Sequence, residues 1–380
     1  MKFLLISSFL PSVLNFRGKL LEAINQQGLE IHIIAPDLAL FKTEQQKLEA
    51  LGYYVHEVPI QRTGTNPVAD LKTLRATYNL MKKIKPDYVL SYTIKPVIYG
   101  TLAAWLAKVP HRFALITGLG YAFQNVEHGS KRSFFQKIVH GLYQQALSHS
   151  HKVFFQNPDD LKLFQELTLL QPNLPTVVVN GSGVNVTDFN VLPFPVNTQN
   201  NPKLSFLLIA RLLGDKGVRE YAEAAKLIKQ QHSEVEFHLV GWIDENPAAI
   251  QQSELDTWVT DSRLKYWGKL SDVRPAIAES SVYVLPSYRE GTPRTVLEAM
   301  AMGRAIITTD APGCRETVIQ GENGFLVEVK SVTSLVDVMQ EFINKPELIE
   351  QMGQRSREIA LHKYDVHQVN RHMMQEMGLI

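Results

Sequence analysis

Seven short apolar runs recur along the first half of the chain, and helix-period segments lie between most of them. A continuous apolar run flanked by amphipathic helices is typical of a strand in a parallel sheet that helices cover on both faces. The runs are KFLLIS, EIHIIA, YYVHEV, DYVLSY, RFALIT, KVFFQN and TVVVN. We therefore expect a Rossmann-like β/α domain over residues 1–186.

The pattern breaks at TDFNVLPFPVNTQNNPK, residues 187–203, which is rich in proline and asparagine and is predicted to be a linker. After it the alternation resumes with LSFLLIA, EFHLV, RLKYW, VYVLP, AIITT and GFLVE. These runs predict a second Rossmann-like domain over residues 204–363. The fold class is therefore α/β, and such domains bind ligands at the carboxyl ends of their strands, here across a cleft between them.

The composition fits two ordinary domains in a reducing compartment. The chain has 380 residues, of which 45% are hydrophobic, and its one cysteine cannot form an internal disulfide. The apolar run FLLI is shorter than a signal-peptide core, and no stretch is long enough to predict a membrane-spanning helix. Residues 1–190 hold 19 basic and 13 acidic side chains, an excess of 6. Chance explains this excess as readily as an anionic partner does.

Two glutamates mark a possible site in the stretch YREGTPRTVLEAMAMG. Glu290 falls in the loop after a predicted strand, and Glu298 falls in the helix that follows. We expect Thr292 to cap this helix, Pro293 to begin it and Gly303 to end it. Donor-binding candidates are the glutamate Glu298 and the helix-start residues Gly291, Thr292, Arg294 and Thr295. A helix start of this kind attracts phosphate, although a solvated loop glutamate and an ordinary helix glutamate would have the same spacing.

Two cations follow the first strand of the second domain in RLLGDKG. Arg211 and Lys216 flank the loop at the carboxyl end of that strand, so they would face the helix start described above. Each alone is more typical of a surface charge, but together with the helix start they predict a clamp for a diphosphate.

These motifs, with TTDAPGCRETVIQGENGFLV, resemble the retaining GT-B glycosyltransferases of family 4, whose E-x7-E motif matches Glu290 and Glu298. In the first half LNFRGKLL, YTIKPVIYG and ALITGLGYAF are similar to the PglA-like N-acetylgalactosaminyltransferases. That bacterial subgroup extends undecaprenyl-diphosphate-linked saccharides. The resemblance implies a GT-B fold and a hexosyltransferase that forms an α-linkage in polysaccharide or glycan assembly. It favours a UDP-N-acetylhexosamine donor, UDP-GalNAc first.

The resemblance also implies residue roles. Glu298 would bind the donor ribose. Glu290 would position the donor sugar, and Arg211 and Lys216 would neutralise the leaving diphosphate. The expected catalytic residues are Glu290, Arg211 and Lys216. Gly18, in the first β/α loop, would let the backbone approach the phosphates, although many members have paired glycines there. Residues 364–380 would form a helix that crosses back to the first domain.

The sequence gives weaker signals for the residues that would bind the acceptor. Lys95, near the end of a strand, is a candidate for the acceptor diphosphate and is equally compatible with a structural role. Thr117 and Gly118 stand where many family members have a histidine near the transferred sugar, so they are the corresponding candidates here. The sequence has no D-x-D metal motif. We therefore expect transfer without metal or other cofactor, since two side-chain cations can replace the metal.

Segment 130–152 predicts an amphipathic helix that either faces a core or lies on an anionic membrane. Its apolar face would hold Phe134, Phe135, Ile138, Leu142, Tyr143 and Ala146, and its basic residues are Lys131, Arg132 and Lys137. Nearby basic residues are Arg75, Lys82, Lys83 and Lys85. If this helix lies on a membrane, the protein is expected to be a cytoplasmic enzyme that associates peripherally with the inner face of the bacterial cytoplasmic membrane.

Other classes fit less well. A GT-B nucleotide-sugar 2-epimerase would share the fold but needs acid and base residues that the sequence does not reveal. An NAD-dependent oxidoreductase needs a G-x-G-x-x-G turn, and GLGYAF lacks the third glycine. A third alternative is a non-enzymatic module that binds a glycan or a nucleotide. Nucleic-acid binding is not expected, because no basic stripe with interleaved aromatic residues occurs.

Overall fold

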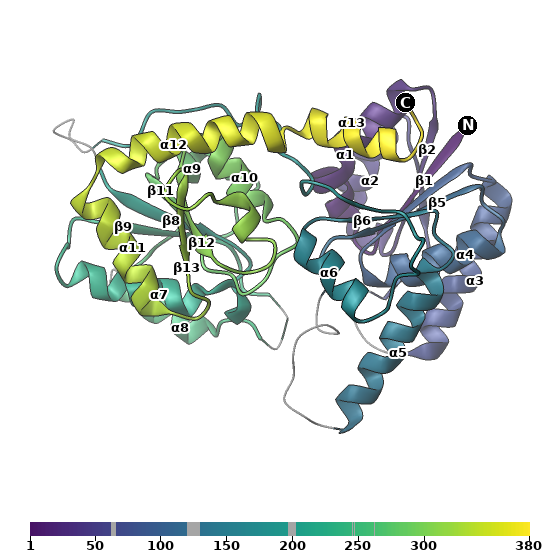
Figure 1. Cartoon of the computed structure of the whole chain (residues 1–380), viewed down its shortest axis with the longest axis horizontal. Coiled ribbons are helices and arrows are strands. Elements are labelled where there is room, and N and C mark those ends of the chain that lie inside the picture. The colour runs from purple at the N-terminus through teal and green to yellow at the C-terminus, as the bar shows by residue number, and fades with distance from the viewer. Residues whose placement is uncertain (62–65, 120–129, 197–202, 245, 247, 262) are drawn as a thin grey trace. The chain divides into compact units, whose positions relative to one another are not determined.

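A computed structural model describes residues 1–61, 66–119, 130–196, 203–244, 246, 248–261 and 263–380, the side chains of 130–135 excepted (Figure 1). The chain forms two compact units. The first consists of Met1–Ser182 with Val369–Ile380, and the second of Gly183–Gln368. The end of the ALITGLGYAF motif, part of the predicted linker and the side chains of Lys131, Arg132, Phe134 and Phe135 lie outside the described residues.

The first unit contains a seven-stranded sheet in the order β3-β2-β1-β4-β5-β6-β7, and every pairing is parallel. Each strand coincides with one of the seven apolar runs, so the parallel α/β prediction is confirmed. The bounds are β1 (Lys2–Ile6), β2 (Glu30–Ala35), β3 (Tyr54–Glu57), β4 (Tyr88–Tyr92), β5 (His111–Ile116), β6 (Lys152–Phe155) and β7 (Thr176–Val178).

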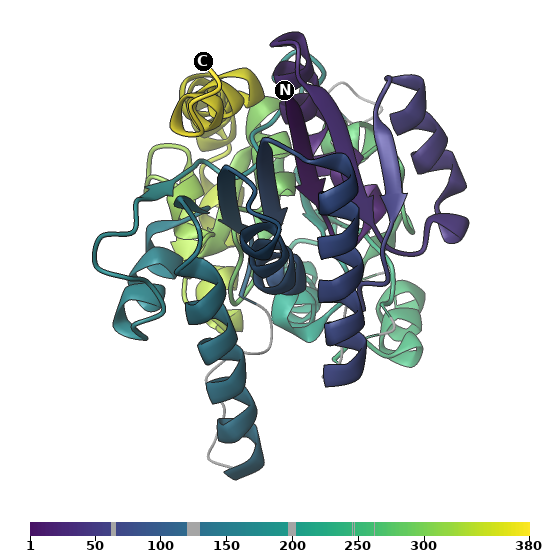
Figure 2. The same cartoon turned by 90° about the vertical axis from the view of Figure 1, so that its right-hand side faces the viewer.

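Helices cover both faces of this sheet (Figure 2). They are α1 (Leu10–Gln26), α2 (Lys42–Ala50), α3 (Pro67–Ile84), α4 (Thr101–Leu106), α5 (Ser130–Leu147), α6 (Pro158–Glu166) and α13 (Val366–Glu376), with the short turns η1 (Leu38–Leu40) and η2 (Pro96–Gly100). At the far end of the chain, Met373, Met374 and Met377 join the core formed by β1 and α1. An ion pair of 2.6 Å between Lys152 Nζ and Glu376 Oε2 adds to this contact.

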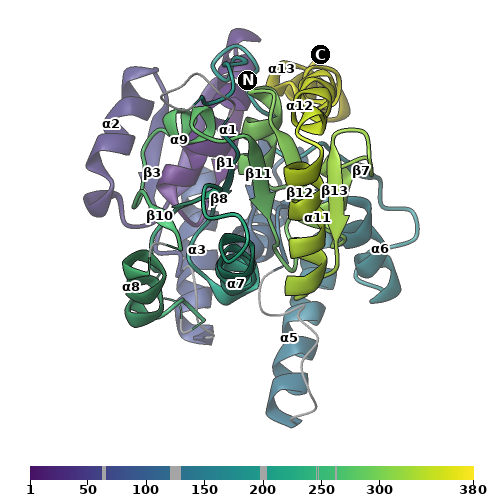
Figure 3. The same cartoon turned by 90° about the vertical axis from the view of Figure 1, so that its left-hand side faces the viewer.

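The second unit contains a six-stranded parallel sheet in the order β10-β9-β8-β11-β12-β13 (Figure 3). Its six strands coincide with the six apolar runs of the second half. They are β8 (Ser205–Ile209), β9 (Glu236–Val240), β10 (Lys265–Tyr266), β11 (Val282–Leu285), β12 (Ala305–Thr309) and β13 (Gly324–Val327).

Helices α7 (Val218–Lys229), α8 (Gln252–Thr260) and α11 (Val332–Asn344) pack on one face of this sheet. Helices α9 (Arg274–Ala278) and α10 (Arg294–Ala301) pack on the other. The remaining elements are α12 (Glu347–Ile359) and the turns η4 (Gly214–Lys216), η5 (Arg315–Thr317) and η6 (Ala360–Tyr364).

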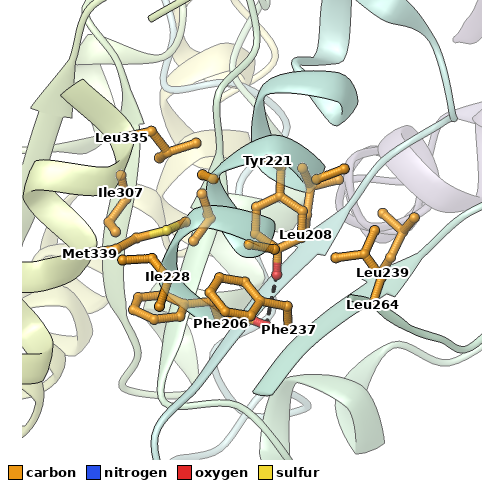
Figure 4. Packing of buried hydrophobic residues seen from close by; sticks show 14 of the residues in the cluster. Phe206, Leu208, Tyr221, Ile228, Phe237, Leu239, Leu264, Ile307, Leu335 and Met339 are labelled. Atoms are coloured by element: carbon orange, nitrogen blue, oxygen red, sulfur yellow. Dashed lines mark hydrogen bonds between the residues drawn. The ribbon is translucent and has the colours of Figure 1, made fainter. Parts of the chain in front are cut away.

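Aromatic rings fill the core beneath α7 (Figure 4). The rings of Phe206 and Phe237 stack with their centroids 5.2 Å apart. The buried Tyr221 hydroxyl donates to the carbonyl oxygens of Phe206 (2.9 Å) and His238 (3.1 Å), so its polar atom is satisfied inside the core. This buried cluster packs one face of the second sheet against α7, α8 and α11.

Two local predictions were wrong. Gly18 lies inside α1 and not in the first β/α loop, because only Ser7–Phe9 separate β1 from a helix that Pro11 helps to begin. On α5 the buried residues are Val139, Tyr143, Ala146 and Leu147, whereas Ile138 is 45% exposed and faces away from the core.

Among the helices of the described residues, none has the length and apolar character that crossing a membrane requires.

Candidate functional site

The carboxyl edge of the second unit's sheet brings together three of the predicted site residues. Arg211 and Lys216 follow β8, and Glu290 follows β11, the strand that pairs directly with β8. Because carboxyl ends of parallel strands meet at one edge, the two loops are adjacent. Lys216 Nζ lies 2.5 Å from Glu290 Oε1, and both side chains are largely buried.

The main chain fixes the position of Lys216. Gly217, the residue after it, has φ +68°, and a Cβ there would lie 2.2 Å from the Pro286 carbonyl oxygen. The N–H of Tyr288 donates to the carbonyl oxygen of Asp215 at 2.9 Å. A glycine therefore lets the loop after β8 pack directly against the end of β11.

The surroundings of Lys216 favour its charged form. Burial acts to lower the pKa of Lys216, but the carboxylates of Glu290 and Asp215 outweigh it, so its pKa lies above the ordinary value. Lys216 therefore stays an ammonium at neutral pH and can face an anionic group.

A glycine in a neighbouring loop supports the Glu290 backbone. The N–H of Glu290 donates to the carbonyl oxygen of Pro312 at 2.9 Å. Gly313 follows with φ +81°, and a Cβ there would lie 2.1 Å from the Glu290 carbonyl oxygen. Only glycine allows this close approach without displacing the loop.

Glu298 lies on α10, is 6% exposed and accepts a hydrogen bond of 2.8 Å from Arg294 Nε, one turn earlier. Burial raises the pKa of Glu298 above its ordinary value, and Arg294 opposes that shift. A buried carboxylate with a single cationic partner is well suited to accept hydrogen bonds from vicinal hydroxyl groups.

The start of α10 differs by one or two residues from the prediction. Pro293 occupies the N-cap and Arg294 is the first helical residue, so Thr292 lies before the cap and does not form it. The Thr295 hydroxyl accepts from the Tyr283 hydroxyl at 2.7 Å, and Tyr283 also donates to the Ile209 carbonyl oxygen at 3.1 Å. Tyr283 thereby ties the start of α10 to the end of β8. Gly291 is buried in the preceding loop.

Arg211 has a partner that the sequence did not reveal. Its Nη1 lies 3.0 Å from Oδ2 of Asp244, in the loop after β9. Asp244 follows the EFHLV strand directly, as GWID, so its place at a carboxyl edge was the only available signal. Among the described residues, no group of three or more His, Cys, Asp or Glu side chains is placed to hold a metal ion.

The acceptor candidates lie in the first unit, and the structure separates them by environment. Lys95 Nζ forms an ion pair of 2.7 Å with Asp70 on α3, and both side chains are nearly buried. Tyr99 donates to the other oxygen of Asp70 at 2.9 Å. Thr117 and Gly118 follow β5 and are half-buried. Lys95 therefore has an evident structural partner, while Thr117 and Gly118 stand at a carboxyl edge as predicted.

Two family models match the chain. One, described as glycosyl transferases group 1, matches residues 203–345, and another, described as glycosyl transferase 4-like, matches residues 6–157. The chain belongs to the family 4 glycosyltransferases of the GT-B fold. The residues of the predicted diphosphate clamp and the E-x7-E pair thus lie within the range that the first model covers.

Curated relatives of this glycosyltransferase act on lipid-linked saccharides or build capsules. The N,N'-diacetylbacillosaminyl-diphospho-undecaprenol alpha-1,3-N-acetylgalactosaminyltransferase of Campylobacter jejuni is 29% identical over 93% of this chain and 92% of its own length. The capsular polysaccharide biosynthesis glycosyltransferase CapM of Staphylococcus aureus is 25% identical over 92% and 89%, respectively.

Among solved structures, the HepE protein of Anabaena in complex with UDP and glucose superposes with a TM-score of 0.77. Its sequence identity is 17%, and the match covers 100% of both chains. At this identity the similarity establishes the GT-B fold of this glycosyltransferase.

Proposed function

We propose that the protein transfers an N-acetylhexosamine, UDP-GalNAc being the favoured donor, to an undecaprenyl-diphosphate-linked saccharide in surface polysaccharide or glycoprotein glycan assembly. The Campylobacter relative, whose name states this chemistry, aligns over 93% of the chain. The observation that carries the proposal is the grouping of Arg211, Lys216 and Glu290 at one carboxyl edge, close to the start of α10. No family match or relative reported above favours the epimerase.

In the proposed reaction the bond between the anomeric carbon and the diphosphate oxygen breaks, and its electron pair stays on the diphosphate. Arg211 and Lys216 stabilise that charge, as preorganised cations do in many transferases. The acceptor hydroxyl attacks on the same face, giving an α-linkage, and its proton passes to the departing phosphate oxygen. The two cations replace a metal ion in this scheme.

The two glutamates have different roles. Glu298 accepts hydrogen bonds from the ribose hydroxyls, and its partner Arg294 keeps the carboxylate oriented. Glu290, held by Lys216, faces the donor sugar and positions its anomeric carbon. A glycosidase acid/base pair is a poor reading, because a hydrolase needs no cation pair beside its carboxylates.

Donor turnover tests this function. Purified protein is incubated with EDTA and one of UDP-GalNAc, UDP-GlcNAc, UDP-glucose, UDP-galactose or GDP-mannose, with and without a lipid-diphosphate saccharide, and released nucleotide is measured. We expect release from a UDP-N-acetylhexosamine that the acceptor stimulates and EDTA does not reduce. Removing Arg211 or Glu298 (Arg211→Ala, Glu298→Ala) is expected to lower kcat/KM by about 10²–10³-fold.

The matched control is Glu341→Ala on α11, which removes an exposed carboxylate paired with Lys345. It is expected to leave turnover unchanged. Absence of UDP binding would contradict the transferase assignment of this site. Turnover that EDTA abolishes and Mg²⁺ restores would contradict the metal-free scheme.

We also propose that the first unit docks on the anionic inner face of the bacterial cytoplasmic membrane, where a lipid-linked acceptor would lie. Basic residues on α3 and at its end support this docking, because Arg75, Lys82, Lys83 and Lys85 are all exposed. In the middle of α5, Lys137 and Ile138 are exposed as well. The amino-terminal part of α5 extends past the ends of α3 and α4 (Figure 2).

Sedimentation with vesicles tests the docking. Each basic residue near an anionic surface contributes about 1 kcal/mol, so replacing Arg75 and Lys82 by Gln should weaken binding roughly 30-fold. The control replaces Lys226 and Lys229 of α7 in the second unit by Gln, with no expected loss. Equal binding to anionic and zwitterionic vesicles would contradict the proposal.

A further inference from the structure

Asp244 holds Arg211 by one oxygen and is itself held by the other. Its Oδ2 accepts from Arg211 Nη1 at 3.0 Å, and its Oδ1 accepts from the N–H of Asn246 at 3.0 Å. Both carboxylate oxygens are thus engaged, one by the main chain and one by the guanidinium. The carboxylate has a defined orientation before any ligand arrives.

The main chain holds the two loops together independently of this ion pair. The N–H of Leu212 donates to the Trp242 carbonyl oxygen and the N–H of Ile250 donates to that of Leu212, each at 2.9 Å. The N–H of Gly214 donates to the Ala248 carbonyl oxygen at 3.0 Å. The loop that carries Asp244 therefore stays beside Arg211 even when the carboxylate is removed.

The ion pair leaves most of the guanidinium available. A guanidinium has five N–H groups in a planar fork, and the hydrogen bond to Asp244 uses only Nη1. The Arg211 side chain is 38% exposed, compared with 22% for Asp244. The remaining N–H groups can therefore face an anion while Nη1 stays on the carboxylate.

We propose that Asp244 is a positioning residue for the diphosphate of a nucleoside-diphosphate donor. It limits the rotamers of Arg211, so that the free N–H groups meet the diphosphate without an ordering cost on binding. This inference rests on the proposed use of a UDP-sugar donor. The same geometry allows the opposite role, in which Asp244 competes with the diphosphate for Arg211, and the two roles predict opposite changes in affinity.

Calorimetric titration with UDP distinguishes these roles. We expect Asp244→Ala to weaken UDP binding about 5–10-fold, Asp244→Asn to weaken it less, and Asp244→Glu to recover part of the affinity. In turnover the loss should appear in KM for the donor, with kcat changed less. Asp256→Ala on α8, an exposed carboxylate of the same unit, is the control.

The decisive comparison uses an Arg211→Ala background. If Asp244 acts through Arg211, then adding Asp244→Ala to Arg211→Ala should change UDP affinity less than twofold. An equal loss in both backgrounds would show a merely structural role and overturn the inference, and so would tighter or unchanged binding in the single variant. A wild-type protein that binds no UDP would instead contradict the proposed function, so the two failures can be told apart.

Discussion

At the scale of single residues, the position of Glu290 depends on groups that hold it from different loops. Lys216 contacts its carboxylate, and Pro312 accepts a hydrogen bond from its N–H. Gly313 allows the loop after β12 to pass directly beneath the Glu290 carbonyl. The Glu290 carboxylate is therefore positioned by residues of neighbouring loops, because Glu290 itself lies in neither a helix nor a strand.

Gly313 tests this placement. Alanine there would place a Cβ 2.1 Å from the Glu290 carbonyl oxygen and 2.6 Å from that of Gly291. We expect Gly313→Ala to destabilise the protein by about 3 kcal/mol or more and to lower kcat, because the Glu290 loop must shift. Thermal unfolding and donor turnover measure the two effects.

Gly321 provides a matched control for this variant. It has a similar φ of +79°, but a Cβ there would meet no heavy atom within 4 Å. Gly321→Ala should therefore cost only the strain of the left-handed backbone, about 1–2 kcal/mol, with normal turnover. Equal losses of stability and activity at both glycines would contradict the steric explanation.

Sequence patterns correctly placed Arg211, Lys216 and Glu290 in the loops that follow two apolar runs, and Glu298 in the helix after the second of these loops. The patterns did not identify Asp244 or Gly313, since their roles depend on which loops meet at the sheet edge. The same patterns misplaced Gly18 and Thr292 by assuming a longer loop after β1 and an earlier start for α10. The apolar runs and helix-start residues thus predicted where the loops lie along the chain, but they could not predict which loops contact one another.

At the scale of elements, a buried arginine fixes the segment before β8. Arg304 is 0% exposed and donates to the carbonyl oxygens of Leu192 (2.9 Å), Pro193 (3.2 Å) and Ile277 (3.1 Å). Its guanidinium also lies over the Phe194 ring, 4.8 Å from the centroid. Burial lowers the pKa of Arg304 to about 10, so the side chain is still charged at neutral pH.

Replacing Arg304 by methionine tests this role. The variant keeps an apolar stem but leaves several buried carbonyl groups without a donor, which should cost about 3–5 kcal/mol. We expect faster proteolysis within residues 187–196 as well. Arg355→Met on α12, where the arginine is exposed and pairs with Glu322 and Glu358, should change stability by about 0.5 kcal/mol or less. Similar stability of the two variants would contradict this role.

Each of the thirteen strands in the described part of the chain coincides with a predicted run. The central strands are the clearest, because parallel strands buried on both faces are continuous apolar runs. The buried faces of the helices were harder to predict from the sequence. On α5 the predicted apolar face correctly included Tyr143 and Ala146, but it also included Ile138, which is exposed, and it omitted Val139, which is buried. These two neighbouring positions differ by about 100° around the helix. The pattern there fits both faces, and only packing against β5 and β6 decides between them.

At the scale of the whole molecule, two sheets of the same kind carry different candidate residues at their carboxyl edges. The second unit has the cations and glutamates expected of a nucleotide-sugar site. The first unit has Thr117 and Gly118 after β5, and exposed basic residues on α3. On this difference we base the proposal that the second unit binds the donor and the first unit binds the acceptor.

Analysis of the lipid-linked product tests the proposed transfer most directly. Purified enzyme would receive UDP-GalNAc and an undecaprenyl-diphosphate saccharide, and the product would be examined by mass spectrometry and by NMR of the new anomeric proton. We predict a product one N-acetylhexosamine heavier, joined by an α-linkage, with one UDP released per residue added. A β-linkage, or UDP-GalNAc converted to another nucleotide sugar while the lipid stays unchanged, would contradict the proposed function.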